Sequence, residues 1–512
     1  MKTNALAVIG GSVAVLALLI AALVIGPFGF RGCNDSAGNA GAAGGDDTLM
    51  LYCAAGIREP VEATIREYEE EYGVTFETSY KGSGTLLSDI RAAGKGDLYL
   101  AADIGYLERA EKLGLIAEIF PIADQYPVIV VAKGNPKNID SLDDLAKEGV
   151  RVSLAEPGAA AIGKAVEQGL SKLGKWDALW DAKTTARSTV NEVANDVAKL
   201  NSADAGIVWN ATAEQYDELE MVEVPELTPL KKQIAIAVLT TCETPAKALK
   251  FARYLTARDR GLKEFEKHAY AVINGDRWKE TPELTVFSGS VNEPVASKII
   301  EEFEKREGVQ VNTTYNGCGI LVGQMKTGVV PDMYFACDTC FVEDVKEMFG
   351  DPLNVAFTDI VIVTAAGNPK NIESPRDMLR EDVRAIINNN TQSALGRITK
   401  RMLDAPQFGF WQELYDKAVD HPATGDIATM QVETDAVDAA IVYKTNAIER
   451  MKRGKLEIIP IDHPLAGATQ PIVIQNDSDF PNLAGRLKQR LSAAREKQRY
   501  EDAGFRFLQE RE

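Results

Sequence analysis

A long-period internal repeat constrains the fold of this 512-residue chain more than any other feature. "EYGVTF" at 71–76 returns as "REGVQV" at 306–311, and "KGNPKNIDS" at 133–141 returns as "AGNPKNIES" at 366–374. The pairs "GDLYLAAD" with "PDMYFACD" and "AGIVWNATA" with "AAIVYKTNA" keep the same offset of 233 to 235 residues. A period this long indicates a duplicated domain and not a solenoid. We therefore predict a membrane anchor or signal at 1–32, a flexible linker at 33–47, and two repeats at 48–279 and 283–512.

Each repeat alternates short apolar or β-branched runs with stretches at helical spacing. In the first repeat, "TLMLYC" and "VTFETSY" are typical of strands, and "EPVEATIREYEEEYG" is typical of a helix that ends at a glycine. This alternation predicts an α/β fold with largely parallel, doubly wound sheets. A second set of strands begins at "PVIVVAKG", and "KKQIAIAVL" returns to a strand late in the repeat. We therefore expect each repeat to form two doubly wound lobes around a cleft.

The uncharged apolar run at 5–25 is long enough to cross a membrane. At about 1.5 Å per residue it would span about 31 Å, and the hydrocarbon core of a bilayer is about 30 Å thick. We expect an uncleaved N-terminal transmembrane helix that serves as a signal anchor. Lipidation at Cys33 is the alternative, although "FRGC" matches a bacterial lipidation motif poorly. Both versions predict a periplasmic or cell-surface protein attached to the cytoplasmic membrane.

The net charge of -19 argues against nucleic acid as a partner, because binding to a phosphate backbone requires clustered Lys and Arg. A small anion site can instead use local dipoles. Three strand-to-helix turns of the first repeat are rich in small residues, namely "CAAGIREP", "KGSGT" and "EPGAAAIG". Glycines let a backbone approach a ligand, and the first N–H groups of a helix have no intrahelical partner. With the hydroxyl of Ser83 as a further donor, these turns predict an anion site that needs no cationic side chain.

The order of motifs resembles one family over nearly all of both repeats. "YCAAGI", "SYKGSGTL", "GDLYLAAD", "AEPGAAAIGK", "LSKLGKW", "TVNEVAND" and "AGIVW" follow one another as in the periplasmic molybdate/tungstate-binding proteins of ABC importers. The resemblance implies two tandem periplasmic-binding-protein-like (type II) domains, a small oxyanion ligand such as molybdate or tungstate, and an importer permease as partner. It implies no enzymatic activity and no cofactor. In the first repeat it points to Ala55, Gly56, Ser83, Ile162, Val190 and Trp209 as oxyanion-binding positions.

Two of these positions depart from the family pattern. Gly56 stands where the family has a first-turn Ser, and Trp209 stands where it has a Tyr. In the second repeat the first turn, "FSGSVNEP", reads as one residue shorter than "YCAAGIREP", and Cys318 replaces the Ser of the second turn. The positions to which the resemblance points there are Ser288, Ser290, Cys318, Leu395, Met430 and Tyr443.

The cysteines of the second repeat raise a rival function. We expect Cys318, Cys337 and Cys340 to converge at the mouth of one cleft, where they would form a disulfide, remain inert thiols, or hold a soft metal or redox site. In the last case the protein would be a cell-surface ligand sensor or a thiol-based metal- or redox-binding module. The three histidines are too far apart in sequence to suggest a metal site of their own, and no catalytic motif stands out.

Overall fold

The structure, a computed structural model, describes residues 48–509. The predicted membrane segment at 5–25, the linker and Cys33 lie outside the described residues. Within 48–509, no helix has both the length and the apolar character needed to span a bilayer. The chain from Thr48 onward forms one compact unit that contains two hydrophobic cores. One core draws on residues from Leu49 to Tyr270 and the other on residues from Leu284 to Phe507.

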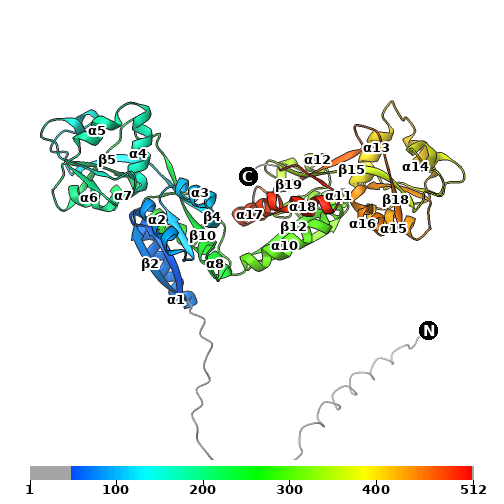
Figure 1. The fold of residues 1–512 in the computed structure, drawn as a ribbon, viewed down its shortest axis with the longest axis horizontal. Helices are drawn as coiled ribbons and strands as arrows, with labels where there is room; N and C mark the ends of the chain where they lie inside the picture. Colours follow the sequence, from blue (N-terminus) through cyan, green and yellow to red (C-terminus); the bar gives the residue numbers. More distant parts are fainter. Residues whose placement is uncertain (1–47, 510–512) are drawn as a thin grey trace, which may run out of the picture. The chain divides into compact units, whose positions relative to one another are not determined.

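The first lobe of repeat one is built on a six-stranded sheet in the order β11-β4-β10-β3-β1-β2 (Figure 1). β1 pairs in parallel with β2 and β3, whereas β10 runs antiparallel to β3 and β4. The strands are β1 (Thr48–Ala54), β2 (Thr75–Lys81), β3 (Leu98–Ala101), β4 (Ile116–Gln125), β10 (Lys232–Leu239) and β11 (Ala271–Val272). The helices of this lobe are α1 (Arg58–Tyr72), α2 (Ser83–Ala93), α3 (Ile104–Lys112), α8 (Pro245–Leu255) and α9 (Gly261–Lys267).

The second lobe has a five-stranded sheet in the order β7-β6-β8-β5-β9. Its strands are β5 (Pro127–Ala132), β6 (Val152–Ala155), β7 (Thr185–Arg187), β8 (Ala205–Trp209) and β9 (Leu219–Val222), and its helices are α4 (Ala161–Lys172), α5 (Trp176–Ala182), α6 (Val190–Ala198) and α7 (Asn210–Ala213). The sheets of both lobes are mixed, not largely parallel as the sequence suggested. The chain leaves the first lobe through β4 and returns through β10, so these two strands pair in opposite directions.

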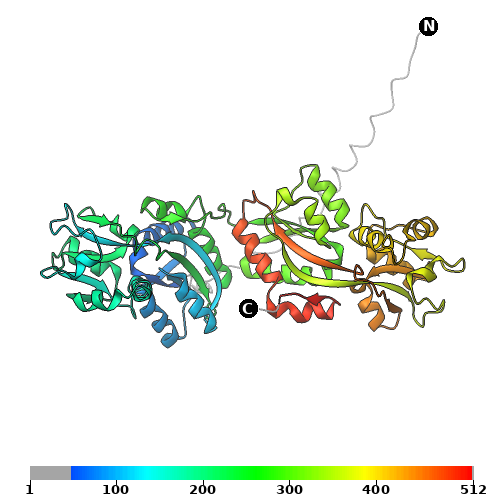
Figure 2. The ribbon, with the colours of Figure 1, turned by 90° about the horizontal axis from the view of Figure 1, so that it is seen from above.

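Repeat two joins its lobes through a single sheet of nine strands. The thirteen-residue β15 (Leu353–Ala365) pairs with β19 in one lobe and with β17 and β18 in the other, and Figure 2 shows it passing between them. Repeat one has two strands in this place, β4 and β5, with Tyr126 between them. The other strands are β12 (Glu283–Gly289), β13 (Gln310–Asn316), β14 (Met333–Phe335), β16 (Ala385–Ile386), β17 (Ala439–Tyr443), β18 (Leu456–Pro460), β19 (Gly467–Ile474) and β20 (Arg506–Phe507).

The helices of repeat two follow the pattern of repeat one. They are α10 (Glu293–Glu307), α11 (Cys318–Lys326), α12 (Thr339–Glu343), α13 (Ala394–Leu403), α14 (Trp411–Lys417), α15 (Gly425–Glu433), α16 (Lys444–Lys452), α17 (Pro481–Leu491) and α18 (Lys497–Asp502). In repeat one, α1 ends at Gly73, a glycine in the left-handed conformation, as the sequence predicted. In repeat two, α10 ends in the same way at Gly308.

The first turns of the two repeats have equal length, which corrects the sequence interpretation. β1 and β12 each have seven residues, and a three-residue 3-10 helix follows each of them, at Ala55–Ile57 and Ser290–Asn292. The position of the proline in the following helix differs instead, since Pro60 is the third residue of α1 and Pro294 is the second residue of α10. Ser290 therefore occupies the position of Ala55.

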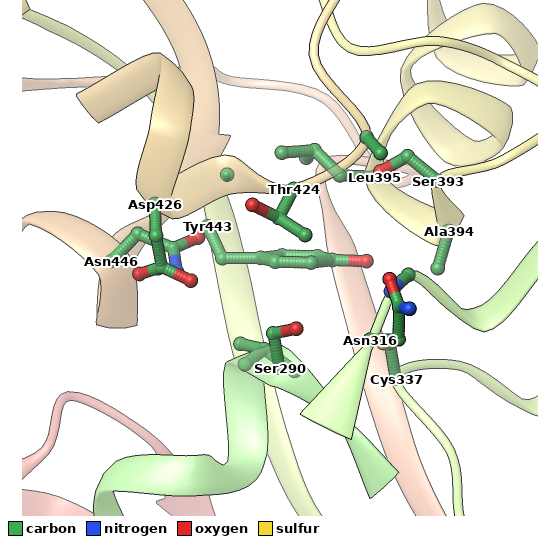
Figure 3. A pocket seen from close by; sticks show the side chains of 14 residues that line it. Ser290, Asn316, Cys337, Ser393, Ala394, Leu395, Thr424, Asp426, Tyr443 and Asn446 are labelled. Atoms are coloured by element: carbon green, nitrogen blue, oxygen red, sulfur yellow. The ribbon is translucent and has the colours of Figure 1, made fainter. Parts of the chain in front are cut away.

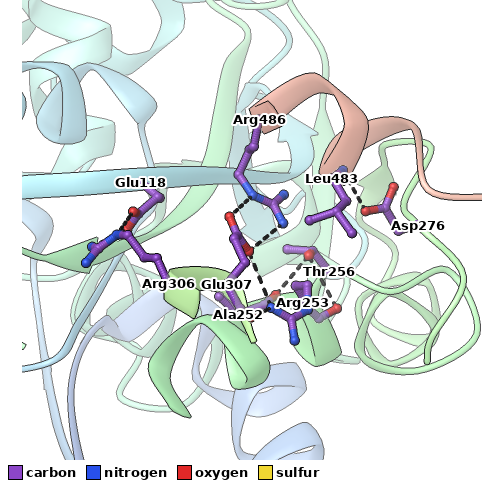
Figure 4. A network of polar contacts seen from close by, with 9 residues as sticks. All are labelled: Glu118, Ala252, Arg253, Thr256, Asp276, Arg306, Glu307, Leu483 and Arg486. Atoms are coloured by element: carbon purple, nitrogen blue, oxygen red, sulfur yellow. Dashed lines mark hydrogen bonds and ion pairs between the residues drawn. The ribbon is translucent and has the colours of Figure 1, made fainter. Parts of the chain in front are cut away.

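A buried ionic network joins the two repeats (Figure 4). Glu307, at the end of α10, accepts hydrogen bonds from Arg486 of α17 at 2.8 and 3.1 Å, and its carboxylate lies 3.3 Å from Arg253 of repeat one. The side chains of Glu307 and Arg253 are 3% and 5% exposed. Asp276 caps α17 by accepting the N–H groups of Asn482 and Leu483 at 2.7 and 2.9 Å. Buried ion pairs and hydrogen bonds therefore connect the two repeats.

Candidate binding clefts

In each repeat the two lobes touch through a backbone hydrogen bond at the Gly-x-Gly turn. The Gly84 N–H donates to the Ala159 carbonyl at 3.0 Å, and the Gly319 N–H donates to the Gln392 carbonyl at 3.0 Å. The donor belongs to the first lobe and the acceptor to the second, so both clefts are closed in this structure. This hydrogen bond holds together the turns that the sequence analysis assigned to anion binding.

The glycines of these turns are required by the close approach of the lobes. A Cβ at Gly84 would lie 2.4 Å from the Gly158 carbonyl oxygen, and one at Gly319 would lie 2.1 Å from the Thr391 oxygen. Real Cβ atoms do not approach backbone oxygens so closely. Both glycines are the second residue of a helix, so their backbone conformation would tolerate other residues. Glycine is required because the backbone of the other lobe leaves no room for a Cβ atom.

Ser83 lies at the start of α2 with its side chain buried. Its hydroxyl accepts a hydrogen bond from the Ala102 N–H at 3.2 Å, and its carbonyl accepts one from the Tyr99 hydroxyl at 2.7 Å. A hydroxyl that accepts from its own lobe keeps its proton for another acceptor. Ser83 is therefore fixed in place with a donor available for a ligand.

The other residues predicted for repeat one lie around the cleft, and all of them except the partly buried Ala55 are buried. Ile162 is the second residue of α4, Val190 is the first residue of α6, and Trp209 is the last residue of β8. Gly56 faces Val190 across the cleft, since a Cβ on Gly56 would lie 2.6 Å from the Val190 Cγ1. Ala55 precedes it in the same short helix. The structure thus brings residues of both lobes together at this point.

Two polar residues of this cleft were missed by the sequence analysis. Asn191 Oδ1 and Thr212 Oγ1 are buried and have no hydrogen-bond partner among the described residues. They lie 3.8 and 3.6 Å from the Cβ position of Gly56. Buried polar atoms are normally paired, so these two mark a place where a ligand or water would complete their hydrogen bonding.

In repeat two the corresponding residues line a narrow pocket between the lobes (Figure 3). Ser290 comes from the first lobe, and Leu395 and Tyr443 come from the second; their role in oxyanion binding stays a prediction. The Tyr443 ring lies between Ser290 and Thr424, with its hydroxyl directed toward Asn316 and Ala394. The free volume of about 20 Å³ holds little more than one water molecule. A larger ligand would require the lobes to move apart.

Three predicted residues of repeat two do not line this pocket, namely Ser288, Cys318 and Met430. Ser288 is fully buried in the first lobe and donates to the Gly289 carbonyl at 3.3 Å. Met430 lies on the surface of α15 and is 50% exposed. The prediction of Met430 is wrong because α6 and α15 both begin after a threonine, Thr189 and Thr424, so the residue in the place of Val190 is Gly425.

Cys318 keeps the hydrogen bond of the serine that it replaces. Its Sγ accepts from the Cys337 N–H at 3.2 Å, as Ser83 accepts from Ala102. Both thiols lie against Gly289, where an added Cβ would be 3.0 Å from the Cys318 Sγ and 2.0 Å from the Cys337 Sγ. A side-chain hydrogen bond between the two thiols, together with burial, raises the pKa of the Cys337 thiol.

Cys340 lies at the start of α12, and all three cysteines are free thiols in the structure. Burial and the neighbouring Asp338 carboxylate raise the pKa of the Cys340 thiol. Between residues 48 and 509, no group of three or more His, Cys, Asp or Glu side chains is placed to hold a metal ion. A disulfide in this group stays a prediction, and the metal-binding alternative gains no support.

Asp426 and Asn446 are the pocket residues of repeat two that the sequence analysis missed. The Asn446 Nδ2 donates to the Asp426 carboxylate at 2.8 Å, and burial raises the pKa of Asp426 above its usual value. The Tyr443 hydroxyl and the Asn446 Oδ1 are buried without a hydrogen-bond partner in the described part of the chain. Asp426 occupies the place of Asn191 when the repeats are aligned through Thr189 and Thr424, and no sequence motif pointed to either residue.

Ion pairing at the rim of the cleft distinguishes the two repeats. In repeat two, Arg397 of α13 pairs with Asp344, directly after α12, and so connects the lobes. The aligned residues of repeat one are Lys164 and Arg109, which carry like charges. Together with Arg91 they line a cavity of about 460 Å³ between the lobes. Among the described residues no ion pair joins these two positions in repeat one, and Lys164 instead lies over the Tyr106 ring of the first lobe, 4.6 Å from its centroid.

Two closed clefts, each between two α/β lobes and lined by helix N-termini, define a protein that binds small solutes. The chain belongs to the family described as bacterial extracellular solute-binding protein, whose model matches residues 49–270 and again residues 284–506. The duplication and the family predicted from the sequence are thereby confirmed. This membership indicates a role in binding rather than in catalysis.

Individual relatives cover one repeat's length at a time. A protein of Haemophilus influenzae described as a binding protein is 30% identical over 223 residues, which is 43% of this chain and 90% of the relative. The molybdate-binding protein ModA of Escherichia coli is 26% identical over 211 residues, 40% of this chain and 80% of ModA. The periplasmic molybdate-binding protein of Azotobacter vinelandii is a structural neighbour with 19% identity and a TM-score of 0.39, covering 44% of this chain and all of the neighbour.

Proposed function

We propose that this chain is the extracytoplasmic binding component of an ABC importer, and that repeat one closes over a small tetrahedral oxyanion. Molybdate and tungstate are the first candidates, since relatives named for molybdate binding align with the chain. The partner is an importer permease, which would recognise the closed form. The apolar run at 5–25 would attach the protein to the outer face of the cytoplasmic membrane, as a signal anchor or through lipidation at Cys33.

The meeting of three helix N-termini at one closed cleft is the observation that supports an oxyanion ligand. α2, α4 and α6 begin at Ser83, Ala161 and Val190, and the first N–H groups of each helix lack intrahelical partners. Their dipoles favour negative charge without a cationic side chain. About five charge-assisted hydrogen bonds at roughly 1.5 to 3 kcal/mol each would contribute on the order of 10 kcal/mol, and micromolar binding requires about 8 kcal/mol.

Titration calorimetry of the full chain with molybdate, tungstate, sulfate and phosphate tests this proposal. We expect Ser83→Ala to weaken oxyanion binding at repeat one by about 10- to 100-fold, the value of one charge-assisted hydrogen bond. Ser171→Ala, an exposed change on α4, is the control and should leave the affinity unchanged. Failure of all four anions to bind repeat one, or an unchanged affinity in Ser83→Ala, would refute the proposal.

A further inference from the structure

The two repeats differ in the charge of their clefts at one pair of aligned positions. α6 and α15 begin in register, so the neutral amide of Asn191 in repeat one is replaced by the carboxyl of Asp426 in repeat two. The spacing from Trp209 to Thr212 equals that from Tyr443 to Asn446, so a hydroxyl is replaced by an amide. Repeat two therefore has an acidic group where the cleft of repeat one has a neutral amide.

No close cation neutralises the Asp426 carboxylate among the described residues. This carboxylate accepts a hydrogen bond from the Asn446 Nδ2. Arg450 of α16 acts on it electrostatically, but the Arg450 guanidinium pairs with Glu433 at 2.8 Å and donates to the Asn446 carbonyl at 3.0 Å. The carboxylate keeps acceptor capacity at the pocket, where it is one of the lining groups.

The remaining groups of the pocket still favour an anion. α11, α13 and α15 begin at Cys318, Ala394 and Gly425, and Gly317, Ala394 and Gly425 line the pocket. Tyr443 is 4% exposed, and its buried hydroxyl has no protein partner in the described residues, so it is a donor for a ligand oxygen. The Asn446 Oδ1, on a residue 8% exposed, is a second acceptor without a donor.

The pocket contains donors that favour a negative charge and acceptors, such as the Asp426 carboxylate, that require a donor from the ligand. One class of ligand supplies both a negative charge and a proton. Fully deprotonated oxyanions, such as sulfate or molybdate at neutral pH, carry only acceptors and would be repelled by a carboxylate within the pocket. An oxyanion that keeps a proton offers negative charge to the helix N-termini and an O–H to an acceptor. We propose that repeat two binds a protonated oxyanion of the hydrogen phosphate class, whose O–H donates to Asp426. The inference rests on the proposed binding function and assigns the two repeats different ligands.

The test uses the full chain with Ser83→Ala, so that binding at repeat one is weakened, and titrates inorganic phosphate and sulfate by calorimetry at neutral pH. We expect phosphate to bind at least 10-fold more tightly than sulfate. Asp426→Asn removes the repulsion and the acceptor charge, so this preference should fall at least 10-fold. Asp416→Asn, an exposed change on α14, is the matched control and should keep the preference.

Three outcomes would overturn the inference: equal binding of sulfate and phosphate, no binding of either, or an unchanged preference in Asp426→Asn whose melting temperature matches the parent. None of them affects oxyanion binding at repeat one, which the chain with intact Ser83 reports separately. Failure of the inference is therefore distinguishable from failure of the proposed function.

Discussion

Gly319 lies at the point of closest contact between the two lobes of repeat two. Substitution by Ala would place a methyl group against the backbone of residues 391 and 392, which cannot move aside as a flexible side chain can. We expect Gly319→Ala to hold the cleft open and to increase hydrogen–deuterium exchange in segment 389–395, which faces this turn.

Gly323 offers a matched control for this prediction. It lies one turn further along α11, and an added Cβ there would meet nothing within 4 Å. Gly323→Ala should leave exchange in segment 389–395 unchanged. Equal exchange in both variants and the parent would show that the lobes do not need the close approach at Gly319.

Single residues also mark the limit of what the sequence could predict. The resemblance placed Ser83, Leu395 and Tyr443 at cleft positions, because each follows a motif of fixed length. It misplaced Met430, because the segment before α15 contains no motif that fixes the register. Asp426 went unnoticed because an acidic residue in the first turn of a helix is ordinary; its importance comes from the neighbours that the fold brings to it.

At the scale of elements, the sequence predicted the alternation of strands and helices and missed the direction of some strands. Apolar periodicity does not encode which way a strand runs beside its neighbour. The crossing between lobes sets this direction, through β4 and β10 in repeat one. The sequence also could not predict that β15 is continuous, since "LNVAFTDIVIVTA" has the pattern of a strand whether or not a break occurs within it.

At the scale of the whole molecule, the Glu307 network should control how firmly the repeats associate. Loss of one partner from a buried ion pair costs about 3 to 5 kcal/mol, because the remaining charges stay buried. We expect Glu307→Gln to destabilise the chain by this amount in chemical denaturation. Glu301→Gln, an exposed change on the same helix, should cost less than about 0.5 kcal/mol. Similar stabilities for the two variants would contradict a stabilising role of the Glu307 network.

The same network predicts a loss of stability in acid. Burial alone would raise the pKa of Glu307, but Arg486 and Arg253 keep it below the usual value of 4.5. A depressed carboxyl pKa gives stability that is complete above the unfolded-state pKa and declines as pH falls through the folded-state value. We expect the stability difference between the parent and Glu307→Gln to shrink below about pH 4.5. Thermal melts at pH 7 and pH 4 would measure it.

The charges at the rims of the clefts bear on how long each repeat retains its ligand. The ion pair between Arg397 and Asp344 must break before repeat two opens. In the described part of repeat one, no ion pair joins the aligned residues Lys164 and Arg109, and Lys164 contacts the Tyr106 ring. Added salt screens attraction and repulsion alike. Raising ionic strength should therefore speed dissociation from repeat two more than dissociation from repeat one, in stopped-flow measurements on the same chain. One protein would then contain a fast-exchanging and a slow-exchanging store of anion, whose release rates converge as salt rises.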